Sequence, residues 1–212
     1  MLDLVVDSSL LRAAVSYATE LKWLVLLIRL IAGELPEFVH PSSTGAGRLP
    51  QDANWCKKAL TDPAQIQAEW CSGCPPDLVG IQTGAVSGII VLDIRRFSGG
   101  RAIFDAMMTP TGSFKTPTVA TPIGGYHTFF QHPGGFIPGI EDLFDDNSGV
   151  AVRADRDFVL APPSVHLSNK TYMWLQRPGT VPLAPLPDFI LEQIRKRLAE
   201  RRADQRGGRP NV

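Results

Sequence analysis

The amino-acid sequence predicts an α+β protein with a mixed or antiparallel sheet. Segments with helical periodicity lie near both ends of the chain, and several short apolar segments bounded by turn residues lie between them. The sequence contains no internal repeat. Its 212 residues suffice for one large domain or for two small domains that pack closely together.

The N-terminal part is predicted to contain one helix and one buried strand. In residues 8–22, leucine, valine and alanine recur at steps of three and four, and a serine at the start can cap the helix. Residues 23–32 are rich in leucine and β-branched residues and end at Gly33, which is typical of a buried strand. Residues 34–54 form a long loop, and loops of that length are commonly functional or mobile.

Further helices and short strands follow. Thr61-Asp62-Pro63 starts a helix that runs to about Trp70, because a Thr or Asp cap followed by proline suits a first helical turn. A short helix is expected around residues 104–108, and an amphipathic helix over residues 187–202 ends the folded part. Its apolar face is formed by Phe189, Ile190, Ile194 and Leu198. The predicted strands are residues 80–82, 89–94, 118–120, 126–131, 150–153 and 158–160.

The expected domain organisation is a main domain over residues 1–180, a C-terminal helical segment over residues 181–205 and a disordered tail over residues 206–212. The formal net charge is zero, but from Arg195 onward seven Lys or Arg stand against two acidic residues. This basic segment either contacts nucleic-acid phosphates or is a solvated helix end.

A cytoplasmic protein without a membrane segment is expected. The longest apolar stretch, residues 23–32, is too short to span a bilayer and contains Arg29. No basic segment of the kind found in secretion signals precedes it.

The three cysteines leave two interpretations open. An odd, small number fits a reducing compartment better than a disulfide framework. Cys71 and Cys74 have the spacing of half a zinc site, which His40 and Cys56 would complete only if the fold brought them close. The alternative is packing and a turn before two prolines.

Asp93 is the first candidate for chemistry. It lies at the end of the apolar segment 89–94, where an unpaired carboxylate would be costly to bury. Residue 95 shares its face of the strand, and an acid there would chelate a divalent cation together with Asp93. Because the residue is Arg95, the pattern indicates an ion pair between Asp93 and Arg95.

The second candidate is the segment around His127. Gly124 and Gly125 precede its strand, and glycines let backbone N–H groups approach a phosphate closely. His127 is then placed to contact a nucleotide phosphate. A single histidine is also compatible with a structural role, so this motif alone leaves both interpretations open.

Several motifs, taken together in their order along the chain, resemble the bifunctional DNA primase/polymerase N-terminal domain family of the archaeo-eukaryotic primase superfamily. The resemblance extends over roughly residues 8–176. The motifs are Thr61-Asp62-Pro63, Gly80-Ile81-Gln82-Thr83-Gly84, Ser87-Gly88, Val91-Leu92-Asp93-Ile94, Thr121-Pro122, Gly124-Gly125-Tyr126-His127, Ala161-Pro162-Pro163-Ser164-Val165-His166 and Tyr172-Met173-Trp174.

The resemblance implies a primase-like fold with an N-terminal αβ unit and a larger unit similar to RNA-recognition modules. It implies DNA replication in a plasmid, phage or mobile element, with a DNA primer-template and nucleoside triphosphates as substrates and a helicase or initiator as a partner in trans. Members hold two Mg²⁺ or Mn²⁺ ions with an Asp-x-Asp or Asp-x-Glu pair and a third Asp. The implied catalytic residues are Asp93, also a metal ligand, and His127; the implied nucleotide-binding residues are Arg48 (or Lys57), Gly124, Gly125, His127 and Arg153.

This chain departs from the family pattern at the metal ligands. The second acid of the pair falls on Arg95 and the third acid on Ala151, and the glycines usual in the next turn are Arg156 and Asp157. One carboxylate binds Mg²⁺ weakly, because the ion prefers six oxygen ligands. Nearby acids that could replace the missing ones are Glu141, Asp142, Asp145, Asp146, Asp155 and Asp157.

Three hypotheses result. The first is a domain that binds nucleotide and DNA with little or no nucleotidyl transfer, the second an active primase/polymerase that uses the replacement acids, and the third a family member retained mainly as a structural domain. In all three we expect Asp93 and His127 on neighbouring strands that face one cleft, with the strand 150–153 beside them.

Overall fold

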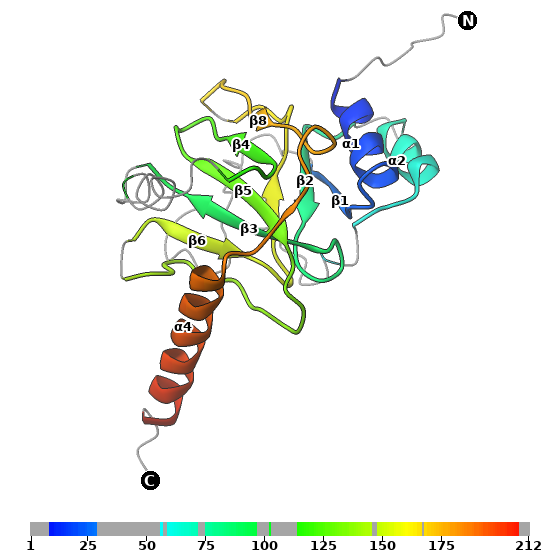
Figure 1. Ribbon diagram of the computed structural model, residues 1–212. Coiled ribbons are helices and arrows are strands. Elements are labelled where there is room, and N and C mark those ends of the chain that lie inside the picture. The colour runs from blue at the N-terminus through cyan, green and yellow to red at the C-terminus, as the bar shows by residue number, and fades with distance from the viewer. Residues whose placement is uncertain are drawn as a thin grey trace, which may run out of the picture.

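The computed structural model describes residues 9–28, 56, 59–71, 75–96, 102, 114–145, 148–166 and 168–207. Its helices and largely antiparallel strands confirm the α+β class (Figure 1). The elements in chain order are α1 (Ser9–Thr19), β1 (Val25–Ile28), α2 (Pro63–Trp70), β2 (Leu78–Gln82), β3 (Ile89–Ile94), β4 (Thr118–Ala120), β5 (Tyr126–Gln131), β6 (Val150–Arg153), β7 (Phe158–Leu160), β8 (Met173–Gln176), β9 (Ala184–Pro185) and α4 (Asp188–Gly207).

The strands form two sheets. The smaller sheet has the order β1-β2-β7, with antiparallel neighbours and with every residue of the central β2 buried. The larger sheet has the order β6-β3-β5-β4-β8, also antiparallel, and β9 adds to β5 in parallel. Because β7 follows β6 along the chain, the smaller sheet is built from both halves of the sequence.

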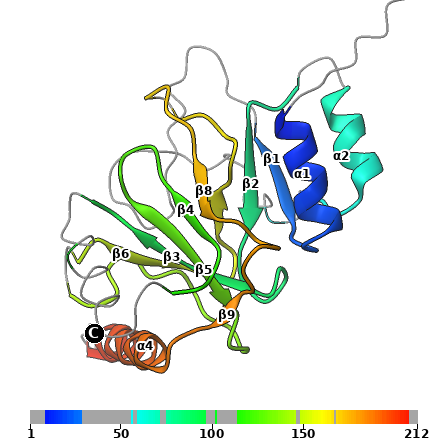
Figure 2. The ribbon, with the colours of Figure 1, turned by 45° about the horizontal axis from the view of Figure 1, so that its top comes forward.

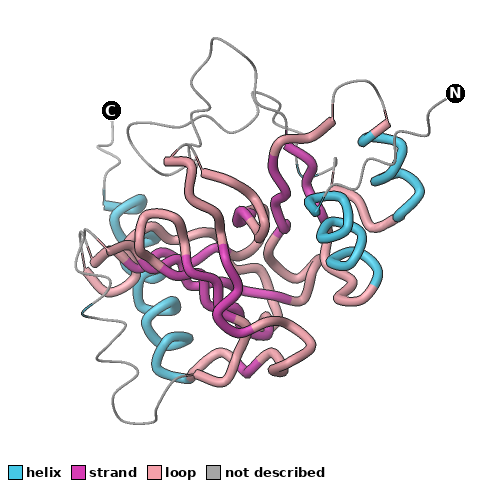
Figure 3. Tube along the Cα trace, turned by 90° about the horizontal axis from the view of Figure 1, so that it is seen from above, coloured by secondary structure: helices cyan, strands magenta, loops and turns pink. Residues whose placement is uncertain are grey.

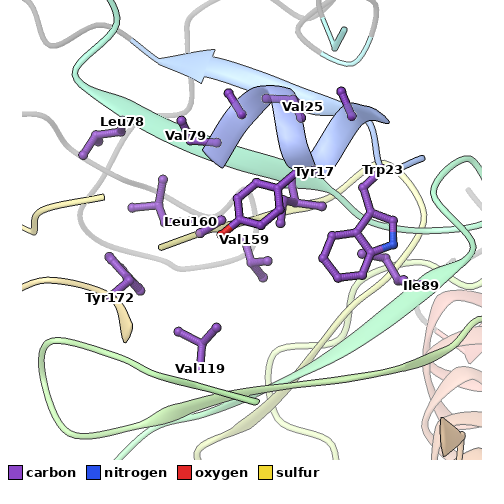
Figure 4. Packing of buried hydrophobic residues seen from close by; sticks show 14 of the residues in the cluster. Tyr17, Trp23, Val25, Leu78, Val79, Ile89, Val119, Val159, Leu160 and Tyr172 are labelled. Carbon is purple, nitrogen blue, oxygen red and sulfur yellow. The ribbon is translucent and has the colours of Figure 1, made fainter. Parts of the chain in front are cut away.

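The two faces of the larger sheet pack against different partners. Side chains alternate along β3, so that Ile89 and Val91 join one core cluster while Ile90, Leu92 and Ile94 join the other. The first cluster also contains residues of α1, α2 and the smaller sheet. Figure 4 shows labelled side chains of this cluster between α1 with the smaller sheet and the strands of the larger sheet. Asp93 follows the same alternation and belongs to this first face.

Helix α4 covers the opposite face. Ile190 and Ile194 are buried in the second cluster, whereas Phe189 at the start of the helix is 42% exposed. Figure 2 shows α4 beside the larger sheet and away from α1 and α2, and Figure 3 shows the strands lying between α4 and these two helices. None of the described helices is long and apolar enough to cross a membrane.

Most predicted elements are found where the sequence placed them. Helix α2 begins after Asp62, whose carboxylate accepts a hydrogen bond from the Ala64 N–H, as predicted for a cap. The C-terminal helix runs five residues beyond the predicted end and includes residues 206 and 207 of the expected tail. The predicted helix at 104–108 lies outside the described residues. Strands β8 and β9 were not predicted: one lies at a sheet edge and the other has two residues.

The buried face of α4 gives a first testable prediction. Replacing Ile190, whose side chain is fully buried, by alanine is expected to lower the free energy of unfolding by about 2–5 kcal/mol through lost packing and a cavity. Phe189→Ala on the same turn is the matched control and should change it little, because that ring is partly exposed. Chemical denaturation measures both. An equal, small effect of the two substitutions would show that α4 is not part of the core.

Candidate functional site

The strand register brings the three principal positions of the expected site together. Asp93 on β3 lies directly opposite His127 on β5 and, on its other side, directly opposite Ala151 on β6. All three therefore share one face of the larger sheet. The expectation that Asp93 and His127 lie on neighbouring strands, with residues 150–153 beside them, is confirmed.

The ion pair predicted between Asp93 and Arg95 is wrong. The carboxylate of Asp93 is held by Arg153 instead, whose Nη2 and Nε lie 2.9 and 3.3 Å from Oδ2. Arg153 stands opposite Val91 on β3, one step diagonally from Asp93, and its long side chain reaches across that step. Only 8% of the Arg153 side chain is exposed, so this is a buried ion pair.

Glu141 links the two arginines. Its carboxylate accepts a hydrogen bond of 2.6 Å from Arg153 Nη1 and one of 2.8 Å from Arg95 Nη2. Arg95 also donates to the Glu141 carbonyl, and its side chain remains 33% exposed. Asp157 Oδ2 lies 3.8 Å from the same Nη1 of Arg153. The site is thus a network of two arginines and three carboxylates.

The network fixes the protonation of its members. Burial is the largest single effect on Asp93 and would raise its pKa, but the charge and hydrogen bonds of Arg153, with smaller contributions from His127 and Arg95, together outweigh burial and hold the pKa of this carboxyl below its ordinary value. Burial lowers the pKa of His127 below its ordinary value, which Asp93 opposes only in part. At neutral pH the site therefore contains an ionised Asp93 and a neutral His127, with 3.7 Å between Oδ1 and Nε2.

Tyr172 is a neighbour of the site to which the sequence had assigned no role. Its ring lies 5.8 Å from the imidazole of His127, centroid to centroid. Burial and the charge of Asp93 both raise the pKa of its phenol, so it stays protonated. The motif Tyr172-Met173-Trp174 was the available signal, but motif order alone could not place its ring beside His127.

The glycine turn before β5 is closed by its own hydrogen bonds. The N–H of Gly124 donates to the carbonyl of Thr121, and the N–H of Gly125 donates to its hydroxyl oxygen. A Cβ on Gly125 would lie 2.1 Å from the carbonyl oxygen of Ile94, so glycine is required there for close backbone packing. Phosphate binding by these N–H groups stays a prediction, and it would have to displace both bonds.

The residues around Asp93 do not fit the metal pair that the resemblance implies. Asp93 lies opposite Ala151, where the third carboxylate is expected, and the guanidinium of Arg153 already lies against its oxygen. Arg95 adds a second fixed cation to the same network. No three His, Cys, Asp or Glu side chains of the described part of the chain gather as metal ligands would. Mg²⁺ prefers six oxygens and is poorly served by such a donor set.

The other candidate residues fall into four groups. Glu141 and Asp157 belong to the network around Arg153, as described above. Asp142 accepts a hydrogen bond from the Gly149 N–H, and Asp155 binds two other loops. Outside the described residues lie Arg48, Lys57, Asp146, His40 and Cys74; the described Cys56 and Cys71 are free thiols.

A cavity of about 400 Å³ lies apart from this network. It is lined mainly by apolar residues, namely Leu21 and Trp23 after α1, Pro117, and residues 178–183, and no residue of the network lines it. Asp93 and His127 share one face, as expected, but this cavity is not the cleft that was expected in front of them.

Comparison with known proteins agrees with this arrangement. The family model for the bifunctional DNA primase/polymerase N-terminal domain matches residues 14–189. No curated protein was found to match the chain. Since the matched range contains both sheets and the whole network around Asp93, the chain belongs to the bifunctional DNA primase/polymerase N-terminal domain family.

Proposed function

We propose that this domain binds nucleoside triphosphates and DNA in a plasmid, phage or mobile-element replication protein, with weak or no nucleotidyl transfer. The observation that carries the proposal is the ion pair between Asp93 and Arg153, beside Ala151, which supplies no carboxylate at the position expected for the third acid. Two-metal catalysis needs carboxylates that hold the ions on both sides of the reacting phosphate. Here the single central carboxylate is already neutralised by an arginine.

Phosphate binding depends on a different part of the same network. Arg95 is the more accessible of the two arginines, with 33% of its side chain exposed against 8% for Arg153. Its guanidinium has a planar array of donors that suits a phosphate, and Nη2 is shared with only one carboxylate, that of Glu141. A triphosphate can therefore compete with Glu141 for Arg95 while the buried pair of Asp93 and Arg153 stays in place.

The test is a pair of measurements on the same protein. Isothermal calorimetry with a nucleoside triphosphate should give measurable binding, which Arg95→Gln weakens and Lys22→Gln, a remote cation on the surface, leaves unchanged. Primer extension with Mg²⁺ should stay at background beside an active polymerase as positive control. Extension by the unchanged chain, or binding that ignores Arg95, would contradict the proposal.

One observation favours a second candidate, an active enzyme with a replacement ligand. Glu141 and Asp93 bind neighbouring nitrogens of the same Arg153 guanidinium, so the two carboxylates lie close together. If Arg153 turned away, they would face each other as a pair of oxygen ligands. In that case primer extension would occur with Mn²⁺ and would be abolished by Glu141→Gln.

A further inference from the structure

Three loops at the far end of the larger sheet are held together by one side chain, Asp155. Its Oδ1 accepts a hydrogen bond of 2.9 Å from the Ala85 N–H, and its Oδ2 accepts one of 2.7 Å from the Ile137 N–H. The same Oδ2 lies 3.2 Å from Nε2 of His132. Asp155 thus joins the loop between β2 and β3, the loop after β5 and the turn between β6 and β7.

His132 extends this connection into the loop after β5. Its side chain is only 3% exposed, and its Nδ1 accepts a hydrogen bond from the Gly134 N–H. Nε2 therefore carries the proton and donates to Asp155. Both ends of the segment 132–137 are fixed to Asp155, so the residues between them are held in one conformation.

An aromatic ring and a guanidinium project from this rigid base. Phe136 is 66% exposed, the largest exposed fraction among the large hydrophobic residues of the described chain. The guanidinium carbon of Arg156 lies 5.9 Å from the centroid of the Phe136 ring. No ion pair joins the Arg156 side chain to another of the described residues. The two residues form what we call the Phe136–Arg156 platform.

Phe136 and Arg156 both adopt unfavourable positions, one in its exposure and the other in its backbone conformation. A phenylalanine in water forfeits the free energy of burying its ring, and Phe136 is 66% exposed although the loop that carries it is hydrogen-bonded at both ends. Arg156 has a φ of 59°, a left-handed conformation that suits glycine and costs other residues about 1–2 kcal/mol. The turn therefore contains an exposed arginine although its backbone conformation is strained for that residue.

The loop beside the ring is open to a flat ligand. Gly134 and Gly135 both have positive φ, and a Cβ added to either would meet nothing within 4 Å. A base can therefore approach the ring of Phe136 without meeting side chains from these two positions. A purely apolar partner would bind poorly beside this cation, because it would remove water from the Arg156 guanidinium without supplying a negative charge.

We propose that the Phe136–Arg156 platform binds single-stranded nucleic acid, with a base stacked on Phe136 and a phosphate held by Arg156. Stacking platforms combined with a cation are how proteins hold single strands without reading sequence. This assignment rests on the proposed function, which includes DNA binding. The platform would be the site that holds the template strand. It involves no residue of the network around Asp93.

Fluorescence anisotropy with a labelled oligothymidylate of about 16 nucleotides tests the platform. Phe136→Ala is expected to weaken binding roughly tenfold or more, and Phe136→Trp should preserve it. Arg156→Gln should weaken binding and lower the slope of log K against log salt by about 0.7, the value for one phosphate contact on a single strand. A duplex of the same length should show no dependence on Phe136, because its bases are already stacked.

Two controls match the two substitutions. Phe189→Ala removes a partly exposed aromatic ring from α4, and Lys22→Gln removes an exposed cation that also has a left-handed φ of 59°. Neither should change binding. If the oligonucleotide binds all variants equally while the protein still binds triphosphate, the platform is wrong and the proposed function stands. If the unchanged protein binds neither ligand, both are wrong.

Discussion

Replacing Arg153 by methionine is expected to lower the free energy of unfolding by about 3–5 kcal/mol at neutral pH. Methionine keeps much of the apolar volume but removes the charge that Asp93, Glu141 and Asp157 share. Asp93 would then lose the guanidinium that binds its Oδ2, whereas Glu141 would keep its ion pair with Arg95. Removing one partner of a buried ion pair is costly because the other partner stays buried and unpaired.

The loss should depend on pH in a defined direction. In the unchanged protein the pKa of Asp93 lies below its ordinary value, so the stabilisation is present above the pKa of the unfolded chain and is lost as the pH falls through the folded pKa. In the variant, burial acts without Arg153 and raises the pKa of Asp93. Protonation of Asp93 then removes the unpaired buried charge of the variant. The difference in the free energy of unfolding between the two proteins should therefore shrink as the pH falls from about 7 to about 4.5.

Urea denaturation over this pH range measures the effect. Arg156→Gln is the control, because Arg156 is an exposed arginine three residues along the chain with no ion pair among the described residues. A variant that unfolds as the unchanged protein does at neutral pH would show that the network is not a buried ion pair. A deficit that grows as the pH falls would contradict the assigned pKa of Asp93.

The second large effect is expected from restoring carboxylates at the two departures from the family pattern. The double variant Arg95→Asp with Ala151→Asp should bind Mn²⁺ and gain primer extension. Residue 151 lies directly opposite Asp93 and residue 95 follows it on the same face, so three carboxylates would converge. Metal ions supply several kcal/mol of transition-state stabilisation, which corresponds to a gain of more than about a hundredfold in rate.

Arg95→Asn with Ala151→Asn is the matched control, since it has the same shape and hydrogen-bonding capacity without the charge. It should gain neither metal binding nor extension. Calorimetry with Mn²⁺ and a primer-extension assay on the same preparations measure the two effects. If the unchanged chain already extends primers as fast as the double variant, Glu141 or another acid completes the site and the proposed loss of activity is wrong.

Local signals in the sequence were sufficient for most of the secondary structure. Asp62 before Pro63 determined the start of α2, and the apolar segment 89–94 was recognisable as a strand from its composition alone. The alternation of side chains along that strand also put residues 93 and 95 on one face, and the structure shows which core that face meets. Motif order then indicated the family, which the family model over residues 14–189 confirmed.

The partner of Asp93 was decided by the tertiary structure. From the sequence, Arg95 was the nearest cation on the same face, yet its side chain turns to Glu141, which comes from a segment 46 residues away. Arg153 reaches Asp93 only because the register of β3 and β6 places it on the diagonal. Which of the two arginines pairs with Asp93 depends on which strands are adjacent and on how far a side chain reaches across them. The local sequence determines neither of these.

The Phe136–Arg156 platform has the same origin. The sequence gives an ordinary Pro-Gly-Gly-Phe loop and an arginine twenty residues later, with nothing to relate them. Asp155 and His132 bring these segments together through hydrogen bonds between loops that are distant in the chain. Short-range propensity thus determined the elements and their faces, whereas contacts between distant segments determined which charges pair and which rings meet the solvent.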